Sequence, residues 1–229
     1  MANIRKVLLA DDDADLRCLG QLSLSKVGGW EVIVAATGEV AVQLAIRELP
    51  DLILLDVAMP VMDGRSALVE LRREPSTAAI PVIFVTAGVH AEECRALVLA
   101  GAVGVVTKPF DALKLPQQLL AMLGSASAPQ ASTPTQDAIA AQRTAYVAAL
   151  PARLDALLTA VDQARRGEVA LARSLAHKLR GSAGSYGLAR LSDAAGRLEE
   201  ALRAEEPPRD APWTELDEAL AMLHDASRV

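Results

Sequence analysis

The chain has 229 residues, of which 52% are hydrophobic and only 3% aromatic, and its formal net charge is −6. This length suits one or two domains, and the negative charge argues against a surface that binds nucleic acid or anionic membranes. We expect no membrane insertion, because no apolar run approaches the roughly 18 residues that a span needs. The N-terminus does not resemble a signal peptide, and Cys18 and Cys94 match no metal or redox spacing. These features predict a soluble, cytoplasmic protein.

Short apolar runs alternate with segments of helical spacing along the first 123 residues. The expected strands are residues 6–10, 30–36, 52–56, 81–86 and 103–107. The expected helices are residues 14–26, 37–49, 65–73, 90–100 and 112–123. This alternation predicts an α/β fold with βαβ units. We expect a doubly wound, five-stranded parallel sheet of the flavodoxin-like order 2-1-3-4-5.

The composition changes after residue 123. Residues 124–136 are rich in Ser, Ala, Pro and Thr without periodicity, which is typical of a flexible linker. Beyond it only helical patterns occur, with breaks expected at Pro151, Gly167, Gly187 and Pro207. The expected helices are residues 137–149, 151–166, 168–185, 188–204 and 213–224. We therefore predict three segments: a domain at 1–123, a linker at 124–136, and an all-α antiparallel bundle at 137–229.

Carboxylates follow two of the expected strands. Asp56 ends the buried run 52–56, at the edge where open α/β sheets bind ligands. Asp11 and Asp12 end the first strand, which neighbours the third where the strand order reverses. Each Asp alone could be an ordinary turn former or helix cap, and Asp13 is expected to cap the first helix. Three converging carboxylates repel one another unless a cation is present, and their oxygens suit Mg²⁺.

Two further strand ends complete a possible reaction centre. Thr86 ends the fourth strand with a hydroxyl, and Lys108 follows the fifth with an ammonium group. Alone, either residue would be unremarkable. A metal ion, a hydroxyl and a lysine around one carboxylate would neutralise a phosphoryl group bound to it, as phosphoryl transfer to a nucleophilic Asp requires.

Four segments in this order carry a resemblance to a known family: Leu-Leu-Ala-Asp-Asp-Asp, Leu-Leu-Asp-Val-Ala-Met-Pro-Val-Met-Asp-Gly, Phe-Val-Thr-Ala and Thr-Lys-Pro-Phe. With them, residues 4–123 resemble the receiver domain of two-component response regulators. The resemblance implies that Asp56 is the phospho-acceptor. It also implies a Mg²⁺ site, a switch hydroxyl, a phosphate contact and a cis peptide bond. The implied Mg²⁺ ligands are Asp11, Asp12, Asp56 and the Ala58 carbonyl. Thr86 would be the switch hydroxyl, Lys108 would contact the phosphate, and Pro109 would follow the cis peptide bond.

One position departs from the receiver pattern. Receivers often carry a Tyr or Phe two residues before the Thr-Lys-Pro, where this chain has Val105. The usual coupling of the switch hydroxyl to an aromatic flip is therefore in doubt, although the chemistry at Asp56 could survive.

The second domain contains a histidine in unusual surroundings. We expect Leu171, Leu175, Leu179 and Ala183 to face the bundle core, which leaves His177 on a different face. That face also carries glycines, which cost about 1 kcal/mol each in a helix relative to Ala and would give a large partner close access. The glycines are Gly181 and Gly184, and Arg173 shares this face. The positive charges of Lys178 and Arg180 would help to hold a phosphoryl group on the imidazole.

The same segment resembles the histidine phosphotransfer (HPt) domain, whose signature is a His, a basic residue three positions on, and Gly-Ser. Here these are His177, Arg180, Gly181 and Ser182. The resemblance covers residues 137–229 and implies that His177 is phosphorylated. A histidine kinase is a poor alternative, because no Gly-rich nucleotide-binding segment is present.

The two resemblances together predict a phosphorelay protein that is a phosphoryl carrier rather than an enzyme acting on other substrates. Its implied partners are sensor histidine kinases and other response regulators. Two other classes remain open. One is an interaction module in which phosphorylation of Asp56 merely masks or exposes the bundle. The other is an aspartyl-phosphate phosphatase, although that class carries a second Asp where this chain has Ala58.

Overall fold

The computed structural model describes residues 4–87, 91–124, 133–165, 167–202 and 221. The chain divides into two compact units, Met1–Gln142 and Arg143–Val229.

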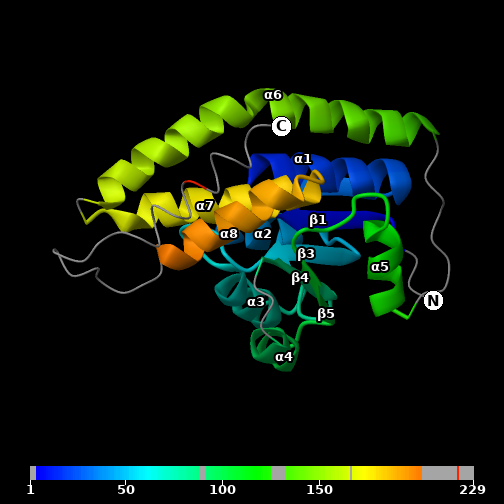
Figure 1. Ribbon diagram of the computed structural model, residues 1–229. Coiled ribbons are helices and arrows are strands. Elements are labelled where there is room, and N and C mark those ends of the chain that lie inside the picture. The colour runs from blue at the N-terminus through cyan, green and yellow to red at the C-terminus, as the bar shows by residue number, and fades with distance from the viewer. Residues whose placement is uncertain (1–3, 88–90, 125–132, 166, 203–220, 222–229) are drawn as a thin grey trace. The chain divides into compact units, whose positions relative to one another are not determined.

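The first unit contains one parallel sheet whose strand order is β2-β1-β3-β4-β5 (Figure 1). Its strands are β1 (Lys6–Ala10), β2 (Glu31–Ala35), β3 (Leu52–Asp56), β4 (Val82–Thr86) and β5 (Gly104–Thr107). Every residue of β3 and β4 is buried, whereas the edge strand β2 is largely half-exposed. Central parallel strands are covered on both faces, so a continuous apolar sequence suits them. The predicted fold class and strand order are confirmed.

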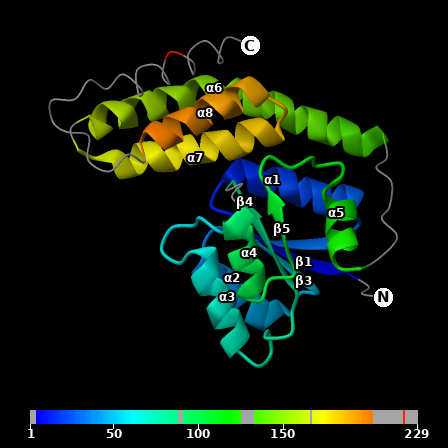
Figure 2. The ribbon, with the colours of Figure 1, turned by 60° about the horizontal axis from the view of Figure 1, so that its bottom comes forward.

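Helices cover both faces of the sheet (Figure 2). They are α1 (Ala14–Leu22), α2 (Gly38–Glu48), α3 (Gly64–Arg73), α4 (Ala91–Leu99) and α5 (Leu115–Met122). Three of them begin with a residue whose side chain caps the helix: Asp13 for α1, Thr37 for α2 and Asp63 for α3. The predicted capping role of Asp13 is confirmed, since its Oδ1 accepts from the backbone N–H of Asp15 at 2.8 Å.

Two helix boundaries differ from the prediction. The first helix is α-helical only to Leu22 and continues as a π-helical turn, Ser23–Val27, that closes with a hydrogen bond from the Gly28 amide to the Ser23 carbonyl. The last helix of this unit begins at Leu115 rather than at 112. The Asp111 side chain accepts a hydrogen bond from the backbone N–H of Leu113 at 2.9 Å. The residues before Leu115 therefore form a turn instead of the first turn of the helix.

The second unit contains α7 (Val169–Ser185), α8 (Ala189–Ala201) and most of α6 (Thr133–Ala164). The predicted break at Pro151 is wrong, because α6 continues through this residue. A proline removes one backbone donor, but Tyr146, Leu150 and Leu157 are buried on both sides of it and hold the helix in the bundle. The helix also begins within the expected linker. The helix predicted over 213–224 lies outside the described residues, apart from residue 221.

The core face of α7 is shifted from the expected one. Leu171 is 53% exposed, so its predicted place in the core is wrong. The buried hydrophobic side chains are those of Ala172, Ala176, Leu179 and Ala183. Their spacing of four, three and four keeps one face, whereas a strict spacing of four rotates around a helix of 3.6 residues per turn.

Within the described residues one helix segment, Gln136–Ala164, is long and apolar enough to cross a membrane, with a mean hydropathy of 1.2. We expected none. The finding is weak evidence for a membrane span, because a core helix of a soluble protein passes the same test. In this segment Tyr146, Leu157 and Ala164 are buried in the second unit.

Gly64 should be essential to the edge of the sheet that carries Asp56. A Cβ at this position would overlap the carbonyl oxygen of Asp56 and approach the Phe84 ring at 3.1 Å. We expect Gly64→Ala to lower the free energy of unfolding by about 1–3 kcal/mol, because the backbone of β3 must move. Urea unfolding followed by circular dichroism measures this. Ser66→Ala, at an exposed position of the same helix, is the matched control, and an equal effect would contradict the packing argument.

Candidate functional site

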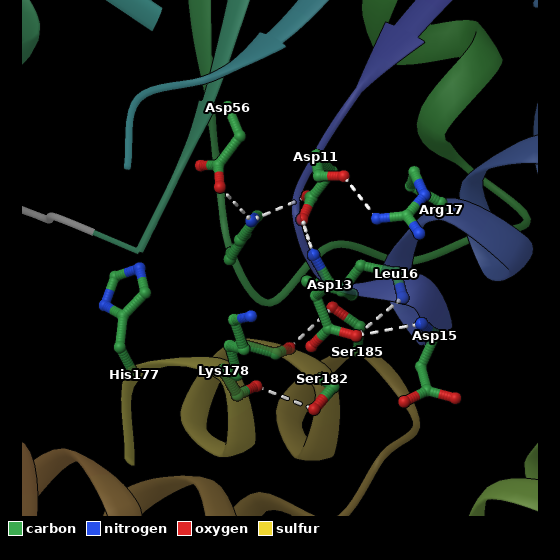
Figure 3. Close-up of polar contacts among 12 residues, drawn as sticks. Asp11, Asp13, Asp15, Leu16, Arg17, Asp56, His177, Lys178, Ser182 and Ser185 are labelled. Carbon is green, nitrogen blue, oxygen red and sulfur yellow. Dashed lines mark hydrogen bonds and ion pairs between the residues drawn. The ribbon is translucent and has the colours of Figure 1, made fainter. Parts of the chain in front are cut away.

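An acidic cluster lies at the carboxyl edge of the sheet, formed by Asp11, Asp12 and Asp56. Asp11 follows Ala10, which pairs with Leu55 of β3, so Asp11 and Asp56 end neighbouring strands. One carboxylate oxygen from each of the three residues lies within 4.8 Å of the other two. Figure 3 shows the Asp11 and Asp56 side chains turned toward the same space. The register of the sheet therefore brings together three residues that lie up to 45 positions apart in the sequence.

Lys108 joins two members of this acidic cluster. Its Nζ lies 2.7 Å from Asp11 Oδ2 and 3.2 Å from Asp56 Oδ2, and all three side chains are at most 3% exposed. Lys108 is held in place from the backbone, since its N–H donates to the Thr86 carbonyl at 2.7 Å. The Lys108–Pro109 peptide bond is cis, as expected. A buried ammonium shared by two carboxylates is the main electrostatic feature of this edge.

Burial and neighbouring charges shift the pKa of the Lys108 ammonium group in opposite directions. Burial lowers the pKa of Lys108, but the charges and hydrogen bonds of Asp56 and Asp11 outweigh it and hold that pKa above its ordinary value. For Asp13, burial and the neighbouring charge of Asp11 raise the pKa above its ordinary value. Lys108 therefore stays cationic at neutral pH and balances part of the negative charge.

Asp11 is fixed from two further directions. Its Oδ1 accepts from the backbone N–H of Asp13 at 2.9 Å, and its carbonyl accepts from Arg17 Nη1 at 2.6 Å. Our sequence reasoning did not single out Arg17. Its position about one turn into α1 was the available signal, because that places a long basic side chain back toward the strand end. Asp11 is thus firmly supported, while Asp12 is the half-exposed member of the acidic cluster.

The remaining predicted residues of this unit lie around the same edge. Thr86 ends β4 and is 6% exposed, while Ala58 is exposed in the loop after β3. Val105 is half-buried and packs against the apolar core, directly opposite Phe84 in the neighbouring strand. An aliphatic core contact therefore occupies the position where receiver domains often carry an aromatic residue.

His177 in the second unit is held by a buried carboxylate. Its Nδ1 lies 3.0 Å from Glu199 Oε1, and Arg180 Nη1 donates to Glu199 Oε2 at 3.3 Å. The Glu199 side chain is only 3% exposed. Because an ionised carboxylate only accepts hydrogen bonds, this contact places the imidazole proton on Nδ1 and leaves the Nε2 lone pair available.

Our sequence reasoning missed Glu199 as a functional residue. The signal was present, since Glu199 falls beside Leu198 on the buried stripe of α8, where a charged residue needs a partner. It also assigned Arg180 to a phosphoryl group, whereas in the structure its guanidinium pairs with Glu199. Lys178 and the exposed Arg173 lie on the same helix as His177.

The turn of α7 that follows His177 is fixed to α6. Ser182 Oγ donates to the Lys178 carbonyl at 2.7 Å (Figure 3) and lies 2.9 Å from the Tyr146 hydroxyl. The single hydroxyl proton of Ser182 is used in the first bond, so Tyr146 is the donor in the second. The Tyr146 ring stacks on Tyr186 with centroids 4.2 Å apart.

Removing the shared ammonium should destabilise the first unit strongly. We expect Lys108→Met to lower the free energy of unfolding by about 3–5 kcal/mol, because it leaves two buried carboxylates without their cation. The double variant Lys108→Met/Asp56→Asn should recover part of this loss. Urea unfolding in the presence of EDTA measures both. Lys114→Met, which removes an exposed ion pair with Asp111, should cost less than about 1 kcal/mol. Equal losses in the two lysine variants would contradict the electrostatic account.

Two family models match the chain. Residues 7–120 match the response regulator receiver domain, and residues 143–228 match the Hpt domain. Together they cover the sheet with its acidic cluster and the bundle that carries His177.

The chain is also similar to individual proteins. The chain is 38% identical over 132 residues to a probable transcriptional regulator, ycf27, of Cyanophora paradoxa, covering 57% of this chain and 53% of the relative. It is 29% identical over 249 residues to the sensor protein GacS of Pseudomonas syringae pv. syringae, covering 98% of this chain and 27% of GacS. The chain thus spans about half or less of the length of these curated relatives. The solved structure of the Vibrio cholerae chemotaxis protein CheY4 is 30% identical, with a TM-score of 0.49, covering 52% of this chain and 99% of CheY4.

The chain belongs to the two-component phosphorelay proteins, with a response regulator receiver domain followed by an Hpt domain.

Proposed function

We propose that Asp56 accepts a phosphoryl group and that His177 carries phosphate to or from receiver domains. The observation that carries the proposal is the ion pair of Asp56 with Lys108 beside Asp11, at the sheet edge that the receiver family model covers. Asp56 supplies a nucleophilic oxygen, and Lys108 supplies a positive charge within 3.2 Å of it. Phosphoryl transfer depends on positioning and charge stabilisation of this kind.

Asp11, Asp12, Asp56 and the Ala58 carbonyl would hold Mg²⁺. The donor set fits, because it consists of oxygens alone and three carboxylate oxygens lie within 4.8 Å of one another. The bound ion would supply charge neutralisation for the phosphoryl oxygens. As the Asp56 carboxylate forms its bond to phosphorus, the bond from phosphorus to the nitrogen or oxygen of the donor would break, and the donor atom would keep the electron pair. Lys108 would pair with one phosphoryl oxygen and the Thr86 hydroxyl would donate to another. Asp11 would keep its place through the N–H of Asp13.

His177 would react through Nε2, since Glu199 holds the proton on Nδ1. In transfer to a receiver, the Asp oxygen forms a bond to phosphorus while the P–N bond breaks. The imidazole Nε2 keeps the electron pair of that bond. Glu199 stabilises the positive charge that the ring carries while it is phosphorylated, and Arg180 keeps Glu199 in position. The leaving group is then a neutral imidazole that already has its Nδ1 proton.

The wider role follows from these two sites. The protein would be a phosphoryl carrier in the cytoplasm, with sensor histidine kinases and other receivers as partners and no nucleic-acid target of its own. The receiver domain would catalyse only its own phosphorylation and dephosphorylation. We retain 1–123, 124–136 and 137–229 as the proposed receiver, linker and HPt segments.

Phosphoryl labelling tests both carrier residues. With a small-molecule phosphodonor and Mg²⁺, we expect label on the wild-type chain, loss of the acid-stable acyl phosphate in Asp56→Asn, and loss of the base-stable phosphohistidine in His177→Gln. Asp51→Asn, an exposed Asp outside the acidic cluster, is the control. No label on Asp56 would refute the receiver assignment. Label on Asp56 with none ever on His177 would favour the interaction module instead.

The Glu199 contact gives a separate prediction. We expect Glu199→Ala to slow labelling of His177 by about 10- to 100-fold, the kinetic equivalent of losing one charge-assisted hydrogen bond. Glu199→Gln should fall between Ala and the wild type, since it keeps an acceptor but loses the charge. Initial rates with phosphoramidate measure this, and Glu200→Ala, at an exposed position of α8, is the control. Unchanged rates in Glu199→Ala would contradict the role given to the carboxylate.

A further inference from the structure

The loop that follows Asp56 has an unusual backbone at Val61. Its φ angle is +67°, and the N–H of Met62 donates to the Pro60 carbonyl at 2.8 Å. This is a γ-turn with positive φ at its centre, which is the rare and strained form. A β-branched residue in this conformation is an outlier. The side chain gains no packing in return, because Val61 is 89% exposed.

The rest of the loop prevents the turn from relaxing. At its start the Val57 N–H donates to the Val85 carbonyl at 3.3 Å, and the Val57 carbonyl accepts from Gly64 at 3.0 Å. At its end the Met62 carbonyl accepts from the N–H of Gly38 at 3.2 Å. With both ends held, the intervening residues must close a tight turn. The strain persists because the surrounding structure over-determines it.

The turn presents an apolar surface beside the acidic cluster. Residues 57–62, which we term the apolar loop, contain no charged or hydrogen-bonding side chain. Ala58, Pro60 and Val61 are exposed in it, while Met59 is buried. Any group that donates phosphate to Asp56 must bring its phosphorus within about 3–3.5 Å of the carboxylate. A protein donor must therefore come close to the apolar loop, whereas a small phosphodonor can reach Asp56 without contacting it.

We propose that the γ-turn holds Val61 out as an apolar contact for the helix that bears the donor phosphohistidine, and so favours protein donors over free phosphodonors. This inference rests on the proposed function of Asp56. The occupant that fits is a helix such as α7, supplied by a second copy of the chain in transfer between molecules. Charge complementarity supports it: Arg173 and Lys178 lie on the same helix as His177, while Asp12 is the half-exposed member of the acidic cluster and Asp15 is half-exposed in the first turn of α1. The attraction between these charges would bring the two surfaces together, and the apolar contact at Val61 would fix the docked position.

Transfer between two full-length variants tests this contact. The donor is the Asp56→Asn chain, labelled on His177 with phosphoramidate and then desalted. The acceptors carry His177→Gln, alone or with Val61→Asn, because asparagine tolerates positive φ but removes the apolar side chain. Val69→Asn, the same change at a valine that is 48% exposed on α3, is the matched control. Labelling of each acceptor by acetyl phosphate with Mg²⁺ reports the chemistry at Asp56 alone.

We expect Val61→Asn to lower kcat/KM for transfer from phosphohistidine by about tenfold, mainly through KM, as the loss of one valine contact implies. Its labelling by acetyl phosphate should be unchanged, and its unfolding midpoint should rise by about 2–4 °C as strain is released. Val69→Asn should transfer like its parent.

Other results would overturn the inference in distinguishable ways. Equal transfer to both acceptors would refute the Val61 contact and leave the function of Asp56 intact. Slower labelling by acetyl phosphate as well would show that the loop acts on the reaction itself. Direct labelling of all acceptors without any transfer from His177 would exclude α7 as the occupant. Absence of label from every acceptor, with either donor, would refute the proposed function along with the inference.

Discussion

The receiver domain depends on one buried ammonium group that two carboxylates share. Asp11 and Asp56 lie at the ends of adjacent strands, where their negative charges would oppose each other if Lys108 did not lie between them. Burying these charges is costly because they lose their contacts with water. Backbone groups support the arrangement: the Asp13 N–H donates to Asp11, and the Lys108 N–H donates to the Thr86 carbonyl. Gly64 packs closely against the Asp56 carbonyl. The same charges that must be balanced for folding are those that phosphoryl transfer would use.

The HPt domain also contains a buried charge that needs a partner, but here the central charge is negative. Its buried charge is the carboxylate of Glu199, which is balanced by Arg180 and oriented toward His177. In both domains the residue that we propose to react lies in or beside a buried ion pair, and its polar partner comes from a different element. Such an arrangement fixes protonation and orientation before a partner arrives, so little reorganisation is needed during transfer.

The sequence was sufficient to predict the sheet, because five apolar runs with capping residues at their ends leave few topologies. It also placed Asp11, Asp56 and Lys108 at one edge, since parallel strands all end there. The Pro151 break and the core position of Leu171 were wrong, because tertiary packing overrides local propensity and strict four-residue spacing drifts around a helix. Glu199 and the strained turn at Val61 escaped prediction, since each depends on contacts or dihedral angles set by other elements.

The central claim is that the chain carries phosphate on both an aspartate and a histidine. Phosphorus NMR of the full-length protein, loaded at Asp56 and then freed of donor, tests it most directly. The account predicts that the acyl-phosphate resonance falls while a phosphohistidine resonance appears, and that this second signal is missing in His177→Gln. Decay of the acyl phosphate to inorganic phosphate at the same rate in both proteins, with no phosphohistidine signal, would contradict it.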